Sequence, residues 1–400
     1  MISRGIYSFT VFFFIFFIGV YLEELIATTI FTLIASANII ASLVSMGLGL
    51  LIIKPLLSKT KNERKAALTL ILIYKLLLAL IITMLAINLP FFKNYSFLIV
   101  FITVFCSLWK FVDLYCESLS RKSYENYFML KAVFSTIILI LKIFILVKNQ
   151  DWVFYILTAE GLFSFFFSLF HNLNWKSTKL VFSSKTISLV ASLVKEGRLV
   201  WLSSALEIGG ARLIFIVIEQ NVSGSYSVLY YFILRVVEGL YIIPNNICAN
   251  FYQKVLLEKN NSDTQILIRK KMMSSCINAS YLIMPLVLSL IWGFLFFKGA
   301  PLKTYLVSTL ILFFVVVLSF FRAWLNREII LNKNYLSLPV SYTLSAGLTL
   351  ALVFVLANYG VFVLLCLLLY YISLSFFPLI VNKKRMNFSN QIIFEKIKSC

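Results

Sequence analysis

The 400-residue sequence is poor in charged residues and in histidine. Only 13% of its residues are charged, whereas 61% are hydrophobic, and the mean hydropathy is +0.95. Soluble globular domains carry about 25% charged residues. The composition therefore predicts a membrane protein that crosses the bilayer many times.

The scarce residue types also exclude several kinds of site. His171 is the single histidine, which excludes a site built from several histidines, and the six cysteines form no CxxC pair that would suggest zinc. The sequence has neither the GxxxxGKS or GxxxxGKT motif of ATP-binding loops nor the DxD motif expected of a lipid glycosyltransferase. We expect no metal, no cofactor and no enzymatic activity.

Long apolar runs dominate what is present, and each is long enough to cross a bilayer as a helix, which takes about 20 residues. We expect twelve spans, at 6–22, 26–53, 67–90, 94–116, 129–148, 152–170, 198–220, 226–250, 276–298, 304–325, 335–357 and 360–382. The predicted fold is all-α, with two six-helix lobes around a central cavity. The lobes are expected at 1–175 and 198–400, joined by a cytoplasmic linker at 176–197, and the mildly amphipathic part 180–194 is expected on the membrane surface.

Basic residues are concentrated in alternate connections between the spans. The connections that follow the even-numbered spans, together with Arg4, hold 27 Lys and Arg residues, including Arg322, and the opposite connections hold four. Cytoplasmic loops carry such an excess, so both termini are predicted to be cytoplasmic. The net charge of +20 is thereby explained by topology and requires no nucleic-acid partner.

The seventh and eighth predicted spans are unusual because they contain charges. The charged residues are Glu207, Arg212, Glu219, Arg235 and Glu238. A charge at the centre of a membrane helix costs about 2.5–3.5 kcal/mol on insertion scales, unless it faces protein or water. We therefore expect these helices to line a wet cavity.

Spacing along the helices sharpens this expectation. At a rise of about 1.5 Å per residue, Arg212 and Arg235 are predicted at similar depth, slightly past the membrane midplane. Tyr231, Arg235 and Glu238 share one helix face. A second interpretation is that the charges form buried pairs that hold helices together. Asn38 in the second span is a further candidate cavity residue, and hydrogen bonding between helices explains it equally well.

Three stretches resemble the polysaccharide-biosynthesis flippases, the Wzx-type O-antigen and capsule transporters of the MOP/MATE-like superfamily. They are Ser45–Leu48 with the basic segment 61–65, the run 193–206, and the set Arg212, Tyr230, Arg235, Glu238, Tyr241 and Pro244. The resemblance covers roughly residues 25–255, and its last set keeps the family's spacing. Two positions depart from the family pattern: Ile214 stands where an acidic residue is frequent, and Val228 stands where a glycine is expected.

The resemblance implies a flippase of the bacterial inner membrane, driven by an ion gradient. Its substrate would be an undecaprenyl-pyrophosphate-linked oligosaccharide repeat unit. From the spacing and the charges, the candidate residues for the pyrophosphate and sugars are Arg212, Arg235, Asn38 and Tyr231, and those for ion coupling are Glu207, Glu219 and Glu238. Membrane lipid, and the polymerase and chain-length proteins of the same pathway, are the implied partners. Arginine suits the pyrophosphate because its charge is fixed and its donors match phosphate oxygens in pairs.

Two other functions stay open at the level of the sequence. A multidrug or small-cation antiporter of the same superfamily is expected to favour acidic cavity residues, whereas here arginines accompany the glutamates. A polysaccharide polymerase resembles a chain with a large outer loop, and every predicted outer connection here is under about ten residues.

Overall fold

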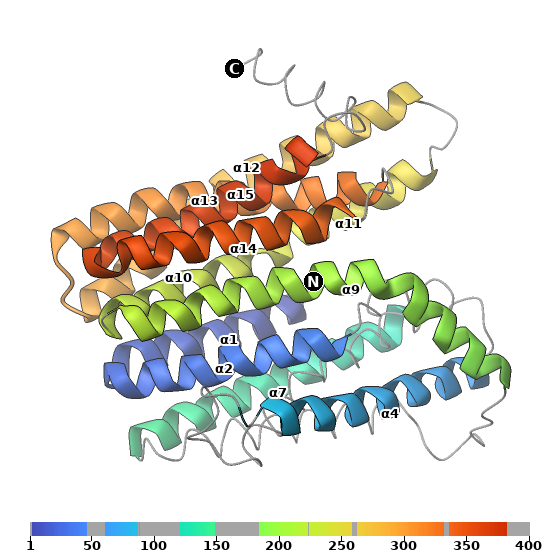
Figure 1. Ribbon diagram of the computed structural model, residues 1–400, viewed down its shortest axis with the longest axis horizontal. Coiled ribbons are helices and arrows are strands. Elements are labelled where there is room, and N and C mark those ends of the chain that lie inside the picture. The colour runs from blue at the N-terminus through green and yellow to red at the C-terminus, as the bar shows by residue number, and fades with distance from the viewer. Residues whose placement is uncertain are drawn as a thin grey trace. The chain divides into compact units, whose positions relative to one another are not determined.

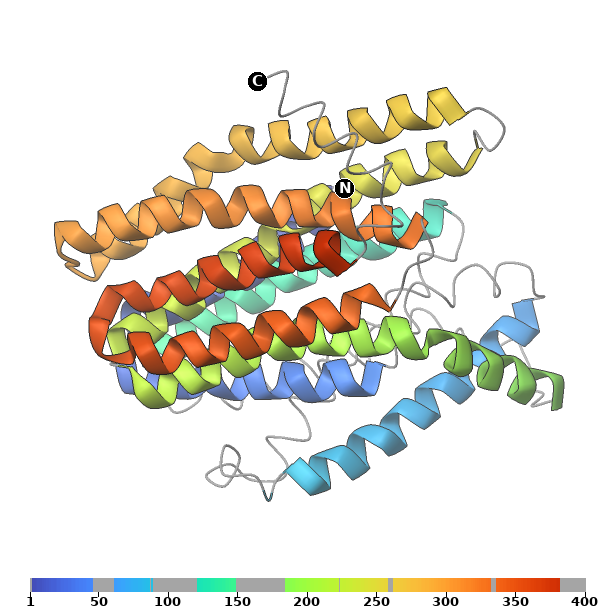
Figure 2. The same ribbon diagram turned by 45° about the horizontal axis from the view of Figure 1, so that its top comes forward.

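The computed structural model describes residues 2–45, 61–86, 88, 121–148, 184–222, 224–257, 262–331 and 336–381 (Figures 1 and 2). Throughout these ranges the regular structure is helical. The spans predicted at 94–116 and 152–170 lie outside the described residues, as do the first residues of the predicted linker.

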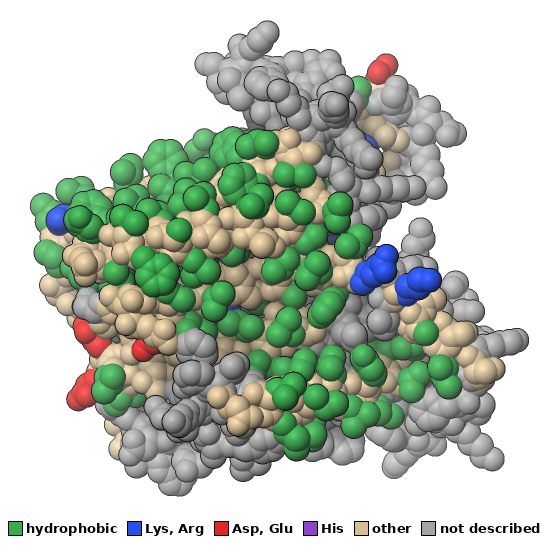
Figure 3. Space-filling view, in the orientation of Figure 1, with side chains coloured by type: hydrophobic (Ala, Val, Ile, Leu, Met, Phe, Trp, Pro, Cys, Tyr) green, Lys and Arg blue, Asp and Glu red, His purple; other side chains and the backbone are tan. Residues whose placement is uncertain are grey.

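The described helices are apolar over lengths that match a bilayer. Five segments qualify as membrane spans by length and composition: Trp201–Asn221, Gly224–Cys248, Asp263–Phe297, Leu302–Ile329 and Ser337–Val381. The last has 45 residues, which is about 68 Å of helix and enough for two crossings. Hydrophobic side chains cover most of the described surface seen in Figure 3. Such runs fold as helices because a helix satisfies its backbone polar groups internally where no water is present.

The chain folds into two compact units. The first takes in Met1–Phe17 and Leu25–Ile216, and the second takes in Ile18–Glu24 and Val217–Cys400. The boundary near Ile216 falls within a helix. The lobe boundary expected at residue 198 stays a prediction.

The helices of the first unit are α1 (Ile2–Tyr21), α2 (Glu24–Ser45), α4 (Lys61–Ala86), α7 (Arg121–Lys148) and α9 (Ser184–Asn221). The last residues of α1 from Ile18, the first residue of α2 and the last residues of α9 from Val217 belong to the second unit. From Ser184 onwards, the segment expected on the membrane surface continues into the seventh span as part of α9.

Polar contacts join helices within this first unit. The hydroxyls of Thr10 in α1 and Ser135 in α7 are hydrogen-bonded at 3.3 Å. The Lys142 ammonium of α7, which is buried, lies 4.4 Å from the centroid of the Phe14 ring of α1. A charge packed on an aromatic face is stabilised by the ring quadrupole, so α1 and α7 are held by more than apolar packing.

The helices of the second unit are α10 (Gly224–Leu240), α11 (Ile242–Leu257), α12 (Ser262–Phe297), α13 (Leu302–Leu331), α14 (Ser337–Leu356) and α15 (Leu364–Val381), with the 3₁₀ helix η5 (Ala357–Val363) between the last two. α12 packs on α13, α13 on α15, and α15 on α14. Both ribbon views show these four helices as neighbours (Figures 1 and 2).

Two helical runs of the second unit are interrupted, each for a local reason. α10 ends at Leu240 and α11 begins at Ile242, because Pro244 has no N–H to donate to the Leu240 carbonyl four residues earlier. Between α14 and α15 the backbone turns at Gly360, which has φ 60° and ψ −120°. Only glycine adopts this conformation without a steric penalty.

Residues 18–24 pack within the second unit through a glycine. A Cβ atom at Gly19 would lie 2.7 Å from a ring carbon of Phe294. Phe294 in turn stacks on Phe232, with 4.2 Å between the ring centroids. The close approach of the end of α1 to α12 therefore requires a residue without a side chain.

Candidate functional site

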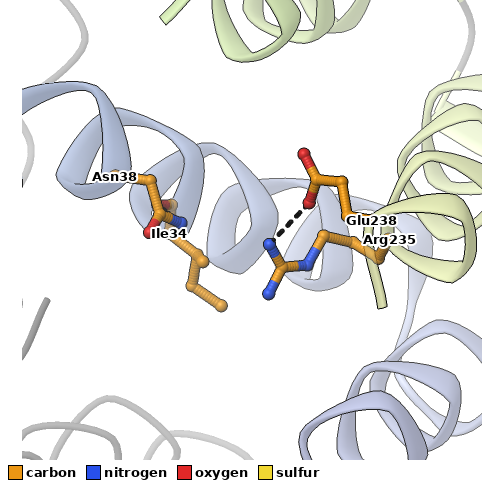
Figure 4. Close-up of polar contacts among 4 residues, drawn as sticks. All are labelled: Ile34, Asn38, Arg235 and Glu238. Carbon is orange, nitrogen blue, oxygen red and sulfur yellow. Dashed lines mark hydrogen bonds and ion pairs between the residues drawn. The ribbon is translucent and has the colours of Figure 1, made fainter. Parts of the chain in front are cut away.

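α10 carries the best-defined charged pair among the predicted site residues. Arg235 Nη1 donates to Glu238 Oε2 at 2.9 Å (Figure 4). The Arg235 guanidinium also lies 6.0 Å from the centroid of the Tyr231 ring. The spacing in the sequence placed these three residues on one face, and their side chains do meet there.

The surroundings of this pair are partly open. The Arg235 and Glu238 side chains are 14% and 28% exposed, respectively, whereas Tyr231 is fully buried. The ion pair engages one guanidinium nitrogen, and a guanidinium carries five N–H donors. The geometry is thus compatible with both interpretations of the pair. It could stabilise the α10 helix by an internal ion pair, or it could be a site where a further anion binds.

The remaining predicted residues are distributed over α2 and α9. Arg212 of α9 belongs to the first unit and is only 3% exposed, so it lies inside protein, as a charge within a span requires. Glu207 and Glu219 are both half-buried on α9. In α2, Asn38 Nδ2 donates to the Ile34 carbonyl oxygen at 2.8 Å (Figure 4), so part of its polarity is satisfied within its own helix.

A polar cluster on α13 went unpredicted. Arg322 was counted with the cytoplasmic connection after the tenth span, but it lies inside α13 and is 4% exposed. Its guanidinium carbon lies 5.3 Å from the ring centroid of Tyr342, 5.7 Å from that of Tyr241 and 6.0 Å from that of Tyr371. Its burial among tyrosines was not predicted, because an arginine near the end of a span has the same sequence pattern whether it faces water or aromatic rings.

Asn326, one turn after Arg322, ties two of these tyrosines together. Its Nδ2 donates to the Tyr241 hydroxyl at 3.3 Å, and its Oδ1 accepts from the Tyr342 hydroxyl at 3.4 Å. We call Tyr241, Arg322, Asn326, Tyr342 and Tyr371 the tyrosine–arginine cluster. It connects α13 with α14, with α15 and with the break between α10 and α11. The four-residue spacing of Arg322 and Asn326 inside an apolar run was the available sequence signal.

A second buried charge follows on the same helix. Glu328 of α13 is fully buried and accepts from Arg269 Nη1 of α12 at 3.3 Å. Removing either partner would leave the other charge without its ion pair, so a single substitution at either position is expected to destabilise the protein. Within the described part of the chain, no group of three or more His, Cys, Asp and Glu residues could hold a metal ion.

No protein-family model and no curated protein matches the sequence. Solved structures, however, match almost its full length. A multidrug resistance MATE family transporter of the MOP superfamily, in an inward-facing conformation, gives a TM-score of 0.58 at 12% identity, covering 99% of this chain and 96% of its own. The eukaryotic MATE transporter AtDTX14 gives 0.54 at 13% identity, with 98% and 96% covered. The chain has the MATE-type transporter fold.

Another MATE structure, in complex with MaL6, agrees, with a TM-score of 0.58 at 14% identity over 98% of this chain and 94% of its own. The predicted fold class is thereby confirmed as an all-helical, polytopic membrane protein of the twelve-helix, two-lobe type. At these identities the likeness describes the fold, and the cargo has to be argued from the residues.

Proposed function

We propose that this protein is a flippase for undecaprenyl-pyrophosphate-linked oligosaccharide repeat units in a bacterial cytoplasmic membrane. The supporting observation is a half-buried arginine, Arg235, held on a span of a MATE-type fold with its guanidinium ordered by Glu238 and Tyr231. A cation clamped in this way attracts pyrophosphate oxygens and repels a cationic cargo. Arg212, buried in α9, is the second proposed phosphate ligand.

The proposal assigns a role to each of the other candidate residues. Tyr231 orients Arg235, and Asn38 contacts sugar hydroxyls. Glu207, Glu219 and Glu238 are the candidates for ion uptake. Glu238 links the two processes, because a proton on its carboxylate weakens the bond to Arg235 and releases that guanidinium for pyrophosphate. The flipped substrate would then pass to the polymerase and chain-length proteins of the same pathway.

A multidrug antiporter is the second candidate function. It is favoured by the likeness to a multidrug resistance MATE family transporter, and its cargo would be an organic cation. The two candidates therefore differ in the sign of the charge that crosses the membrane.

Proteoliposomes containing the purified full chain separate the two functions. One assay follows a fluorescent undecaprenyl-pyrophosphate-linked sugar, whose outer-leaflet fraction is destroyed by an impermeant quencher. A parallel assay follows uptake of a cationic dye. We expect accelerated flipping of the anionic lipid under an ion gradient and no dye transport above protein-free vesicles. Gradient-driven dye transport without lipid flipping would instead identify an antiporter.

A further inference from the structure

A small pocket with both polar and apolar lining residues lies at the turn between α12 and α13, within the second unit. We call it the turn pocket; its polar lining includes Glu24, Tyr226, Lys298 and Thr304, and Phe294 is among its apolar residues. Its volume is about 260 Å³. A water molecule takes up about 30 Å³ in the liquid, so the pocket has room for a chemical group much larger than water.

The turn pocket combines charges of both signs. Lys298 follows the last residue of α12, and Glu24 is the first residue of α2. Burial lowers the pKa of the Lys298 ammonium below its ordinary value, and the nearby Glu24 carboxylate offsets part of this shift. The pocket therefore presents both a carboxylate and an ammonium to one occupant.

An apolar groove of about 750 Å³ shares Ala300 with the turn pocket. Trp292 of α12 lines it together with residues of one face of α13, among them Tyr305, Leu306 and Leu310. Leu306 is 65% exposed and Leu310 62% exposed. Trp292 Nε1 donates to Thr309 Oγ1 at 2.9 Å, which fixes the indole ring along this face. Tryptophan and tyrosine at the ends of spans are typical of the level of lipid headgroups, so this groove faces the hydrocarbon just below that level.

We propose that the turn pocket and the groove together bind one phospholipid with a primary-amine headgroup, phosphatidylethanolamine. The lipid phosphate accepts from Lys298, the lipid ammonium donates to Glu24, and an acyl chain lies along the groove. The charges select among lipids: phosphatidylglycerol has no cation for Glu24, and the choline group of phosphatidylcholine has no N–H to donate. This inference is independent of the cargo that the protein transports.

Native mass spectrometry of the purified full chain tests the proposal, after mixing with equimolar phosphatidylethanolamine, phosphatidylglycerol and phosphatidylcholine. We expect phosphatidylethanolamine to be retained about tenfold more strongly than either competitor, as one charge-assisted hydrogen bond allows. Glu24→Gln should abolish this preference, and Lys298→Met should weaken retention of all three lipids.

Two neighbouring residues provide matched controls. Lys303→Met removes a lysine of the same turn whose ammonium lies over the Phe362 ring, and Glu23→Gln removes the carboxylate next to Glu24; neither residue lines the turn pocket. Both controls should retain lipid as the unsubstituted protein does. Equal retention of the three lipids, or an equal loss in Lys303→Met and Lys298→Met, would overturn the proposal.

Discussion

Arg235 contacts a carboxylate and an aromatic ring at the same time, which restricts the directions in which its remaining donors can point. Arg322 is also surrounded by aromatic rings, but it is nearly inaccessible. Exposure therefore separates the two arginines. Arg235 is partly accessible, as the proposed phosphate contact requires, whereas Arg322 is enclosed by α13 and its neighbours.

Arg235→Lys is the sharpest test of the proposed phosphate contact. Lysine keeps the charge and loses the planar fork, so we expect lipid flipping in proteoliposomes to fall by about tenfold or more, with protein level unchanged. Arg198→Lys, at an exposed position of α9, is the matched control and should flip normally.

The opposite interpretation of the pair predicts a different pattern. If Arg235 and Glu238 only brace α10, Arg235→Lys should flip normally, and Arg235→Ala should lower the amount of folded protein. The exchanged pair Arg235→Glu with Glu238→Arg should then restore both level and activity. That pattern would remove Arg235 from the substrate site.

At the scale of elements, the turn between α14 and α15 in the second unit depends on one glycine at the end of a helix. α14 and α15 pack against each other because the backbone turns between them at Gly360. The ring of Tyr226 occupies the space beside this glycine, 3.1 Å from where a Cβ would stand. The turn thus depends on the absence of a side chain for two reasons, its positive φ and its close contact with α10.

Gly360→Ala should therefore destabilise the protein by about 1–3 kcal/mol, the usual cost of a strained backbone conformation. Thermal unfolding in detergent measures the effect. Gly347→Ala, within α14 and with no atom within 4 Å of the added Cβ, should leave stability unchanged or raise it, because alanine favours helix over glycine. An equal effect of the two substitutions would show that Gly360 is under no special constraint.

At the scale of the whole molecule, the predicted orientation in the membrane follows from charge. Lys and Arg residues occupy the connections of one side far more often than those of the other, and positively charged loops remain in the cytoplasm.

Reporter fusions check the orientation directly. A reporter that works only in the cytoplasm should be active when fused after residue 180 or residue 390, and inactive when fused after residue 300, which lies in the turn between α12 and α13. Activity at residue 300 combined with inactivity at residue 390 would invert the predicted topology.

The helical class and most spans were predictable from the sequence because their causes are local. A run of about 20 apolar residues satisfies its backbone only as a helix in hydrocarbon. The same locality explains why the Arg235–Glu238 contact was foreseen, since a spacing of three residues puts two side chains on one face whatever the helix packs against. The roles of Arg212, Asn38 and the glutamates stay predictions.

Other features depended on which helices meet, and a linear pattern does not contain that information. Arg322 lies near the end of the predicted span 304–325, and only the packing of α13 with α14 and α15 surrounds it with tyrosines. Glu24 and Lys298 are 274 positions apart in the chain, and they share a pocket because residues 18–24 fold into the second unit. Short-range periodicity thus determined the elements, whereas long-range packing decided which of their polar side chains are buried together.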